Sequence, residues 1–304
     1  MAKSVKIKYS LLTPIVLRSK RSNSFFHCSG DAKMFMQGAI SASKQGKAAI
    51  HQCAKTNGST VYIKRFLVAG IMEGAELKDS DRGTPQGGLI SPVLANVYLH
   101  YVLDLWFEKA IRPKLRGEAY YVRFADDFLI LFQYENESRD VLEVLKRRLG
   151  KFMLEVAEDK TRILPIGRFK GTKDEFDFLG FTFFNAKTRE GKYRLGIRTS
   201  KKKLKAKRQA AKAWLRTRMV RPIPETMMKV AAIIRGHCNY YGVNGNLRSL
   251  YKFHDYMKQM THKMLNRRSQ KGYVTNEKFQ RVWDYYVAPP KLTKDIWQWI
   301  PKTV

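Results

Sequence analysis

Residues 120–132 read YYVRFADDFLILF, and this stretch constrains the fold more than any other in the chain. Two runs of aromatic and β-branched residues flank Ala125, Asp126 and Asp127, a composition that predicts two short strands joined at a hairpin turn. The fold must therefore contain an antiparallel strand pair. Two neighbouring carboxylates at its tip would raise each other's pKa unless a cation neutralises them.

Mg²⁺ suits such a position, because it prefers oxygen ligands, keeps several waters and bridges protein carboxylates to substrate phosphates. Two such ions about 4 Å apart activate an attacking hydroxyl and stabilise a leaving pyrophosphate. The alternative is an ordinary acidic hairpin turn, since Asp is common in turns. The apolar flanks are compatible with both interpretations, so the spacing alone leaves them open.

The charge balance indicates the class of partner. The chain has 304 residues, with 58 Lys and Arg against 26 Asp and Glu, which gives a formal net charge of +32. A field of this strength favours a bound polyanion, with nucleic acid as the first candidate and an anionic membrane surface as the second. No stretch reaches the roughly 18 uninterrupted apolar residues of a membrane span, so we expect nucleic acid and no membrane.

Cysteine usage and the first residues bear on localisation. Cys28, Cys53 and Cys238 form no CxxC pair and no zinc spacing, which is typical of a reducing compartment. We therefore expect a cytoplasmic protein; that the protein is bacterial is a separate expectation. Residues 1–30 contain six basic residues, six serines and no acidic residue, so a mitochondrial or plastid targeting segment is an alternative. A nucleic-acid-binding arm is another.

Periodicity outlines a mixed α+β first part. Ser91-Pro92 predicts a helix start, and Ser138 is a candidate N-cap for a helix that runs to Phe152. Residues 161–166 and 176–184 are further strand candidates. We expect three segments: a divergent basic N-terminal segment at 1–64, a mixed domain at 65–190, and a helical basic domain at 191–304.

The basic domain opens with ten Lys and Arg and no acidic residue in 199–222, and three helical patterns follow it. Ten like charges favour a bound polyanion, although a solvated charged helix would look the same. Tyr240 and Tyr241 fit either a helical core or stacking on RNA bases, and His237 fits packing or phosphate contact. The residues predicted to bind RNA are Lys201, Lys202, Lys203, Lys205, Lys207, Arg208 and Arg235.

Several stretches resemble one known family. YVRFADDFLILF resembles the (Tyr/Phe)-Ala-Asp-Asp box of reverse transcriptases, and GTPQGGLISPVLANVYLHYVLD looks like the preceding box of their group II intron branch. AEDKTRIL resembles the segment with the lysine after the palm helix, and FDFLGFTF resembles the primer grip. IIRGHCNYYGVNGNLRSLYKFHDYM is similar to the maturase, or thumb, domain. The resemblance covers about residues 66–290.

This resemblance implies a right-hand polymerase fold of the α+β class. Its palm is an antiparallel sheet with packed helices, and an all-helical maturase/thumb domain follows. Asp126 and Asp127 match the catalytic, metal-binding aspartates, which implies Mg²⁺ as cofactor. Gln86, Gly87, Gly88 and Lys160 match positions that contact template or nucleotide. The implied partners are group II intron RNA, an RNA template with a DNA primer, and dNTPs.

The sequence departs from the family near its start. Asp31 is the candidate for a third metal ligand, but MQGAIS after it differs from the family pattern. The 30 residues before it are too few for a fingers domain, so the chain resembles an N-terminally shortened member. Two functions stay open: an RNA-directed DNA polymerase (a nucleotidyltransferase) with maturase activity, or a non-catalytic RNA-binding maturase that assists group II intron splicing. The oligomeric state is open as well.

Overall fold

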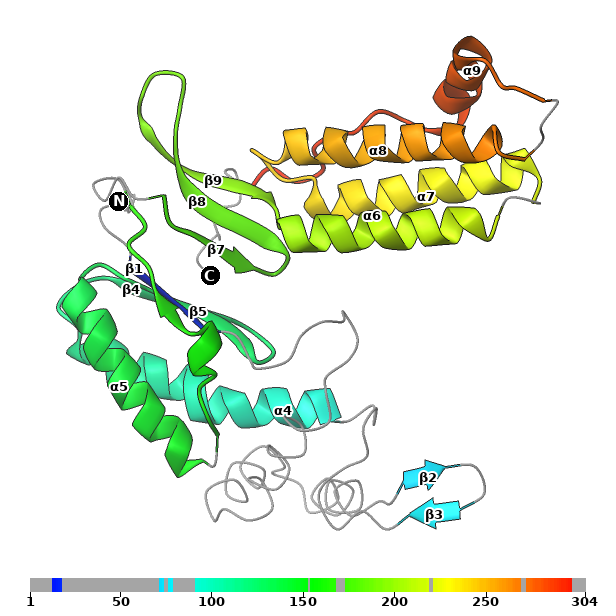
Figure 1. The fold of residues 1–304 in the computed structure, drawn as a ribbon. Helices are drawn as coiled ribbons and strands as arrows, with labels where there is room; N and C mark the ends of the chain where they lie inside the picture. Colours follow the sequence, from blue (N-terminus) through cyan, green and yellow to red (C-terminus); the bar gives the residue numbers. More distant parts are fainter. Residues whose placement is uncertain are drawn as a thin grey trace, which may run out of the picture. The chain divides into compact units, whose positions relative to one another are not determined.

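The computed structural model describes residues 13–17, 71–73, 76–78, 91–152, 154–167, 173–218, 221–268 and 272–296. The chain divides into two compact units, Met1–Asp174 and Glu175–Val304 (Figure 1). Four of the candidate site residues lie outside the described ranges: Asp31, Gln86, Gly87 and Gly88.

The first unit contains the predicted hairpin within a four-stranded antiparallel sheet. Its strand order is β4-β5-β1-β6, with β4 at Ala119–Phe124, β5 at Asp127–Phe132, β1 at Thr13–Leu17 and β6 at Arg162–Ile163. A separate two-stranded sheet pairs β2 (Ile71–Glu73) with β3 (Glu76–Lys78). In the hairpin Phe124 pairs with Asp127, which leaves a turn of two residues.

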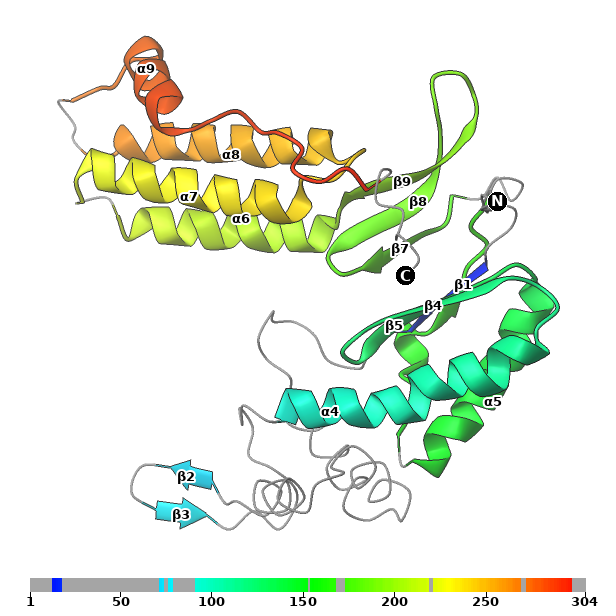
Figure 2. The same cartoon turned by 180° about the vertical axis from the view of Figure 1, so that it is seen from behind.

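Helices cover one face of this sheet, as Figures 1 and 2 show from opposite sides. Helix α4 (Ser91–Leu99) continues through the π-helical segments η1 (His100–Asp104) and η2 (Phe107–Ile111) into the 3₁₀ turn η3 (Arg112–Lys114). Helix α5 spans Glu135–Lys151, and a 3₁₀ turn, η4, spans Glu158–Lys160. The core between helices and hairpin includes Tyr98, Val102, Phe107, Ile130, Phe132 and Leu145, each at most 1% exposed.

Helix α5 begins one turn earlier than predicted. Its N-cap position is Tyr134, and Ser138 lies inside the helix, where its buried hydroxyl donates to the Glu135 carbonyl at 2.6 Å. Glu135 and Glu137 occupy the first turn, where carboxylates interact favourably with the helix dipole. The carboxylate of Glu137 also accepts a hydrogen bond from the backbone N–H of Arg116 at 2.8 Å. Charge, and not a capping hydroxyl, therefore sets this helix start.

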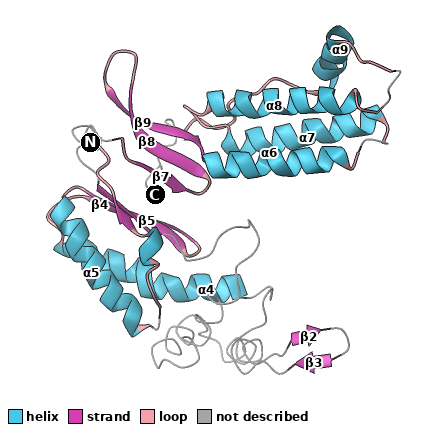
Figure 3. Ribbon diagram, viewed as in Figure 1, coloured by secondary structure: helices cyan, strands magenta, loops and turns pink. Residues whose placement is uncertain are grey.

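The second unit combines a three-stranded antiparallel sheet with helices, coloured by type in Figure 3. The strands are β7 (Glu175–Phe178), β8 (Phe181–Lys187) and β9 (Tyr193–Thr199). The helices are α6 (Lys201–Arg216), α7 (Ile223–Tyr241), α8 (Leu247–Leu265) and α9 (Asn276–Tyr286). Helices α6, α7 and α8 lie side by side and share one core that includes Leu215, Met227, Val230, Leu250, Phe253 and Met257.

The boundary between the units differs from the predicted one at 190/191. That position falls in the β8–β9 hairpin, whose register runs from Phe181↔Thr199 to Lys187↔Tyr193. Because β9 lies inside 191–304, the expectation of an all-helical second domain was wrong. The prediction followed the change in charge composition, whereas the compact unit follows strand pairing. Ser200 then leads from β9 directly into α6.

Asn246 ties this sheet to the helices. Its side chain is buried; its Oδ1 accepts from the Thr199 N–H at 2.8 Å, and its Nδ2 donates to Thr199 Oγ1 at 2.9 Å and to the Tyr241 carbonyl at 2.8 Å. One amide therefore joins the end of β9 to the connection between α7 and α8. Among the described helices of both units, none has the length and apolar composition needed to cross a membrane.

Candidate active site and nucleic-acid interface

The two aspartates lie at the tip of the β4–β5 hairpin. Ala125 and Asp126 form the turn, and Asp127 is the first residue of β5. Ala125 has a φ of 54°, in the left-handed region that a residue with a side chain rarely adopts. Strained backbone of this kind tends to occur at functional sites. Asp126 is exposed, Asp127 is half-buried, and the ring of Phe124 beside them is 63% exposed.

A single guanidinium fastens this turn to the helices of the same unit. Arg123 donates from Nε and Nη2 to the two carboxylate oxygens of Asp104, at 2.7 and 2.6 Å. Its Nη1 donates to Asn96 Oδ1 and to the Ala125 carbonyl, both at 2.9 Å. Asn96 belongs to α4 and Asp104 to η1. The backbone that carries the two aspartates is therefore fixed by the side chain of Arg123, the last residue but one of β4.

The charges of this network are balanced internally. Burial alone would raise the pKa of Asp104, but hydrogen bonds from Arg123 and His100 outweigh it, so the pKa lies below its ordinary value. The hydrogen bond with Asp104 in turn raises the pKa of Arg123. Both groups stay ionised at neutral pH. The carboxylate of Asp104 accepts from Nε and Nη2 of Arg123. The contact of Arg123 with the turn is therefore made by Nη1, which donates to the backbone carbonyl of Ala125.

The donor set at the tip suits a hard divalent cation. Asp126 and Asp127 supply carboxylate oxygens, the ligands that Mg²⁺ prefers. In the part of the chain that the structure describes, no group of three or more His, Cys, Asp or Glu side chains could hold a metal together. Mg²⁺ does not require such a cage, because one or two carboxylates with substrate phosphates and water complete its shell. The pair therefore fits Mg²⁺.

Lys160 lies in the same unit as the hairpin. It ends η4, and β6 begins two residues later. Strand β6 pairs with β1, which pairs with β5, so one strand separates the lysine's segment from the strand of Asp127. The side chain of Lys160 is half-buried.

The lysines predicted to bind RNA share helix α6 but divide into two groups. Lys201, Lys202 and Lys205 are exposed, and Lys203 is half-buried. Lys207 lies against α8 with Nζ 5.6 Å from the centre of the Phe253 ring, and burial lowers its pKa. Arg208 donates to the Lys252 carbonyl at 2.6 Å, and its guanidinium carbon lies 4.9 Å from the Tyr256 ring. The structure therefore gives Lys207 and Arg208 packing contacts with α8.

The structure shows which of the ring side chains of α7 are buried in the helical core and which are accessible to RNA. His237 and Tyr241 are buried in the core, so neither presents a face for stacking on bases. Tyr240 is 40% exposed and stacks on Phe181, with ring centres 5.9 Å apart. Arg235 is exposed on the same helix, as a phosphate ligand would be.

The segment that resembles a primer grip is the β7–β8 turn. Leu179 and Gly180 both have positive φ, at 49° and 81°. Tyr240 donates its hydroxyl to the Leu179 carbonyl at 3.0 Å. A Cβ at position 180 would lie 2.8 Å from the Tyr241 hydroxyl, so this position needs glycine for space as well as for conformation. The tyrosine pair of α7 therefore shapes this turn.

The sequence prediction missed Arg123, Asp104 and Asn96. One signal was available: Ala119, Tyr121 and Arg123 alternate along β4, and the first two face the core. A charged residue on the inward face of a strand requires a buried partner. The partner is Asp104, and it reaches Arg123 because of how η1 packs on the sheet. No local sequence pattern predicts this packing.

Part of the chain is similar to reverse transcriptases. Residues 45–183 match the model of the reverse transcriptase (RNA-dependent DNA polymerase) family, and this range includes the hairpin with both aspartates. The group II intron-encoded protein LtrA of Lactococcus lactis subsp. cremoris is 27% identical over 266 residues, which cover 63% of this chain and 44% of the relative. These matches support the group II intron branch of the reverse transcriptases as the family that this chain resembles.

Further matches are more distant. Protein YkfC of Escherichia coli (strain K12) is 26% identical over 164 residues, which cover 43% of this chain and 40% of that relative. The chain therefore spans less than half the length of these curated relatives. A solved structure of apo telomerase from Candida tropicalis, truncated from its C-terminal domain, superposes with a TM-score of 0.41 at 13% identity, covering 61% of this chain and 36% of that one. A likeness at this level carries no argument about function.

Proposed function

We propose that this protein is an RNA-directed DNA polymerase that also binds group II intron RNA as a maturase. The observation that supports it best is the position of Asp126 and Asp127. They stand together at the accessible tip of a hairpin, inside the range that matches the reverse transcriptase family. Two like charges persist in such a place when a divalent cation and a polyanionic substrate occupy the space before them.

Each residue of the hairpin tip has a part in this proposal. Asp126 and Asp127 would hold Mg²⁺, which would offset the negative charge of substrate phosphate. Mg²⁺, when bound, lowers the pKa of the primer 3′-hydroxyl and stabilises the charge on the departing pyrophosphate. Arg123 keeps the carbonyl of Ala125, and with it the turn, in place. The exposed ring of Phe124 offers an apolar surface to a sugar or base next to the reacting ends.

The partners of this activity are an RNA template with a DNA primer, and dNTPs. The exposed lysines of α6 and Arg235 of α7 serve as phosphate ligands for group II intron RNA. Lys160, together with Gln86, Gly87 and Gly88, contacts template or nucleotide. The high net charge of +32 supports a polyanionic partner of this kind.

Primer extension on an RNA template, with a DNA primer, dNTPs and Mg²⁺, tests the polymerase claim. Wild-type protein should extend the primer. Asp127→Asn should abolish extension and leave RNA affinity nearly unchanged, because it removes a cation ligand and no phosphate ligand. Asp140→Asn is the matched control, since Asp140 is an exposed aspartate on α5 of the same unit. A loss of affinity as large as the loss of extension would contradict the assignment.

A second candidate function is that of a non-catalytic maturase that binds intron RNA and assists its splicing. It is favoured by the exposed lysines of α6, which belong to the second unit and need no cation to act. Wild-type protein that yields no extension product, yet binds intron RNA tightly and with strong salt dependence, would establish this function in place of the first.

A further inference from the structure

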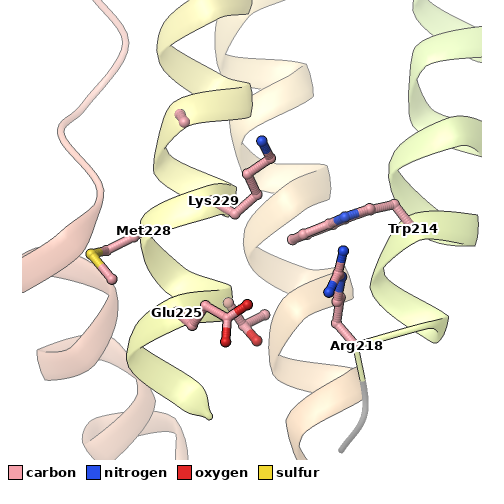
Figure 4. A pocket seen from close by; sticks show the side chains of 7 residues that line it. Trp214, Arg218, Glu225, Met228 and Lys229 are labelled. Carbon is pink, nitrogen blue, oxygen red and sulfur yellow. The ribbon is translucent and has the colours of Figure 1, made fainter. Parts of the chain in front are cut away.

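A cleft in the second unit opens between the end of α6 and the start of α7. Its volume is about 400 Å³. Trp214 and Arg218 border it from the α6 side, and Glu225, Met228 and Lys229 from α7 (Figure 4). This is the small end of the range for ligand sites, roughly 300–1,000 Å³. The cleft therefore suits a single small group.

An aromatic surface and a cation lie together on one side of this cleft. In Figure 4 the ring of Trp214 extends from α6 toward α7, with Arg218 below it. The guanidinium carbon of Arg218 lies 5.8 Å from the centre of the indole. Trp214 is half-buried, so its ring is positioned by packing and still accessible from the cleft.

The charged side chains that border the cleft do not pair with one another in the described part of the chain. Among the described residues, Arg218, Glu225 and Lys229 form no ion pair, although all three border the same space. The Nε of Arg218 is buried and has no hydrogen-bond partner in the described part of the chain. A buried donor of this kind costs free energy unless something accepts from it. The other guanidinium nitrogens of Arg218 and the ammonium of the exposed Lys229 can therefore donate to an anion beside the flat ring of Trp214.

We propose that this cleft binds one unpaired nucleotide of a bound RNA strand. Trp214 stacks on the base, Arg218 and Lys229 bind the adjoining phosphate, and the Glu225 carboxylate accepts from an N–H group of the base edge. Unpaired RNA bases are commonly recognised by this combination of a ring, cations and edge contacts. The inference rests on the proposed RNA binding and adds a specific site to it.

The size of the cleft supports a single nucleotide as the occupant. A peptide would need an extended groove, which a cleft of this size does not provide.

Tryptophan fluorescence tests the stacking directly. Titration of the full chain with a short single-stranded oligouridine should quench part of the emission. The quenching should vanish in Trp214→Phe and persist in Trp106→Phe, a control in the first unit. Trp214→Ala should weaken single-strand binding about tenfold and leave binding to an RNA duplex nearly unchanged, since only an unpaired base can enter.

Photo-crosslinking keeps the proposal testable if Trp214→Ala fails to fold. Wild-type protein irradiated with 5-bromouridine RNA should give a cross-link that mass spectrometry locates on the peptide containing Trp214. Cross-links only elsewhere, with RNA binding intact, would overturn the cleft as a nucleotide site and leave the proposed function standing. Absence of any RNA binding would overturn both.

Discussion

The guanidinium of Arg123 donates a hydrogen bond of 2.9 Å to the carbonyl of Ala125, the residue just before the two aspartates of the hairpin tip. The same group is held by Asp104 in a bidentate pair and by Asn96. Because Ala125 adopts a left-handed φ of 54°, the conformation of the turn must be stabilised by contacts from outside it. The network supplies these contacts from helix residues packed beneath the sheet.

Removal of Arg123 should loosen this turn and weaken its unit. Arg123→Ala leaves the half-buried carboxylate of Asp104 without its main partner, which should cost about 1–3 kcal/mol. Hydrogen exchange of the β4 and β5 peptides, read by mass spectrometry, measures this cost locally. Arg123→Lys should recover part of the stability but not the fork geometry, so extension should stay well below wild type.

The matched control for this prediction is Arg112→Ala. Arg112 pairs with Glu108 at 2.7 Å in the same unit, but both side chains are about half exposed. Exposed pairs of this kind contribute below about 1 kcal/mol. If Arg112→Ala raised exchange in the hairpin as much as Arg123→Ala, the network around Ala125 would have no special role.

This network also marks the limit of prediction from the sequence. The strands on either side of Asp126 follow from their apolar and β-branched composition, and the structure confirms them. The ion pair of Arg123 with Asp104 joins residues 19 apart and depends on how η1 packs on the sheet. Long-range geometry of this kind is set by the whole core, and no local pattern carries it.

The domain boundary predicted from charge composition was also wrong because it ignored long-range strand pairing. The boundary at 190/191 followed the onset of the basic region, but β9 precedes that helix and pairs back onto β8. Charge on the solvent-exposed surface indicates what the protein binds. The limits of a compact unit depend instead on which strands form backbone hydrogen bonds with each other. The same distinction separates Lys205, exposed on α6, from Lys207, which packs against α8.

Asn246→Ala should destabilise the second unit strongly. The buried amide satisfies the Thr199 N–H, the Thr199 hydroxyl and the Tyr241 carbonyl, and truncation leaves all three without it. The expected cost is about 2–4 kcal/mol, seen as faster hydrogen exchange in β9 and at the α7–α8 connection. Asn244→Ala is the control, because the side-chain bond of Asn244 among the described residues is an exposed one, to Asp295, at 2.6 Å. Equal effects of the two variants would contradict the clamp.

His237 should make the second unit sensitive to acid. It is fully buried, neither ring nitrogen has a partner among the described residues, and burial with the nearby Lys207 charge lowers its pKa from 6.5 to about 3. The unfolded chain therefore binds the proton first as pH falls. Stability contributed by the neutral ring is complete above pH 6.5 and is lost toward pH 3.

The size of this effect is set by linkage, at about 1.4 kcal/mol for each pH unit inside that window. Urea denaturation of wild type and His237→Phe at pH 7 and pH 5.5 measures it. The phenylalanine ring can keep the contacts with Tyr241 and Phe253. Between pH 7 and pH 5.5 the free energy of unfolding should therefore fall by about 1.4 kcal/mol less in the variant than in wild type. Parallel pH profiles for the two proteins would show that His237 does not carry the effect.

Reversal of the exposed lysines should reveal how RNA lies on α6. If Lys201, Lys202 and Lys205 contact phosphates, their combined change to Glu should weaken RNA binding and lower the slope of log K against log salt by about 0.7 per lost contact. Lys263, Lys278 and Lys291 are also exposed in the second unit and give a control triple with the same change in net charge. Binding isotherms over a range of salt concentrations separate a local track from a general charge effect. Equal slopes for the two triples would mean that RNA responds to the total charge of the unit and follows no particular face of α6.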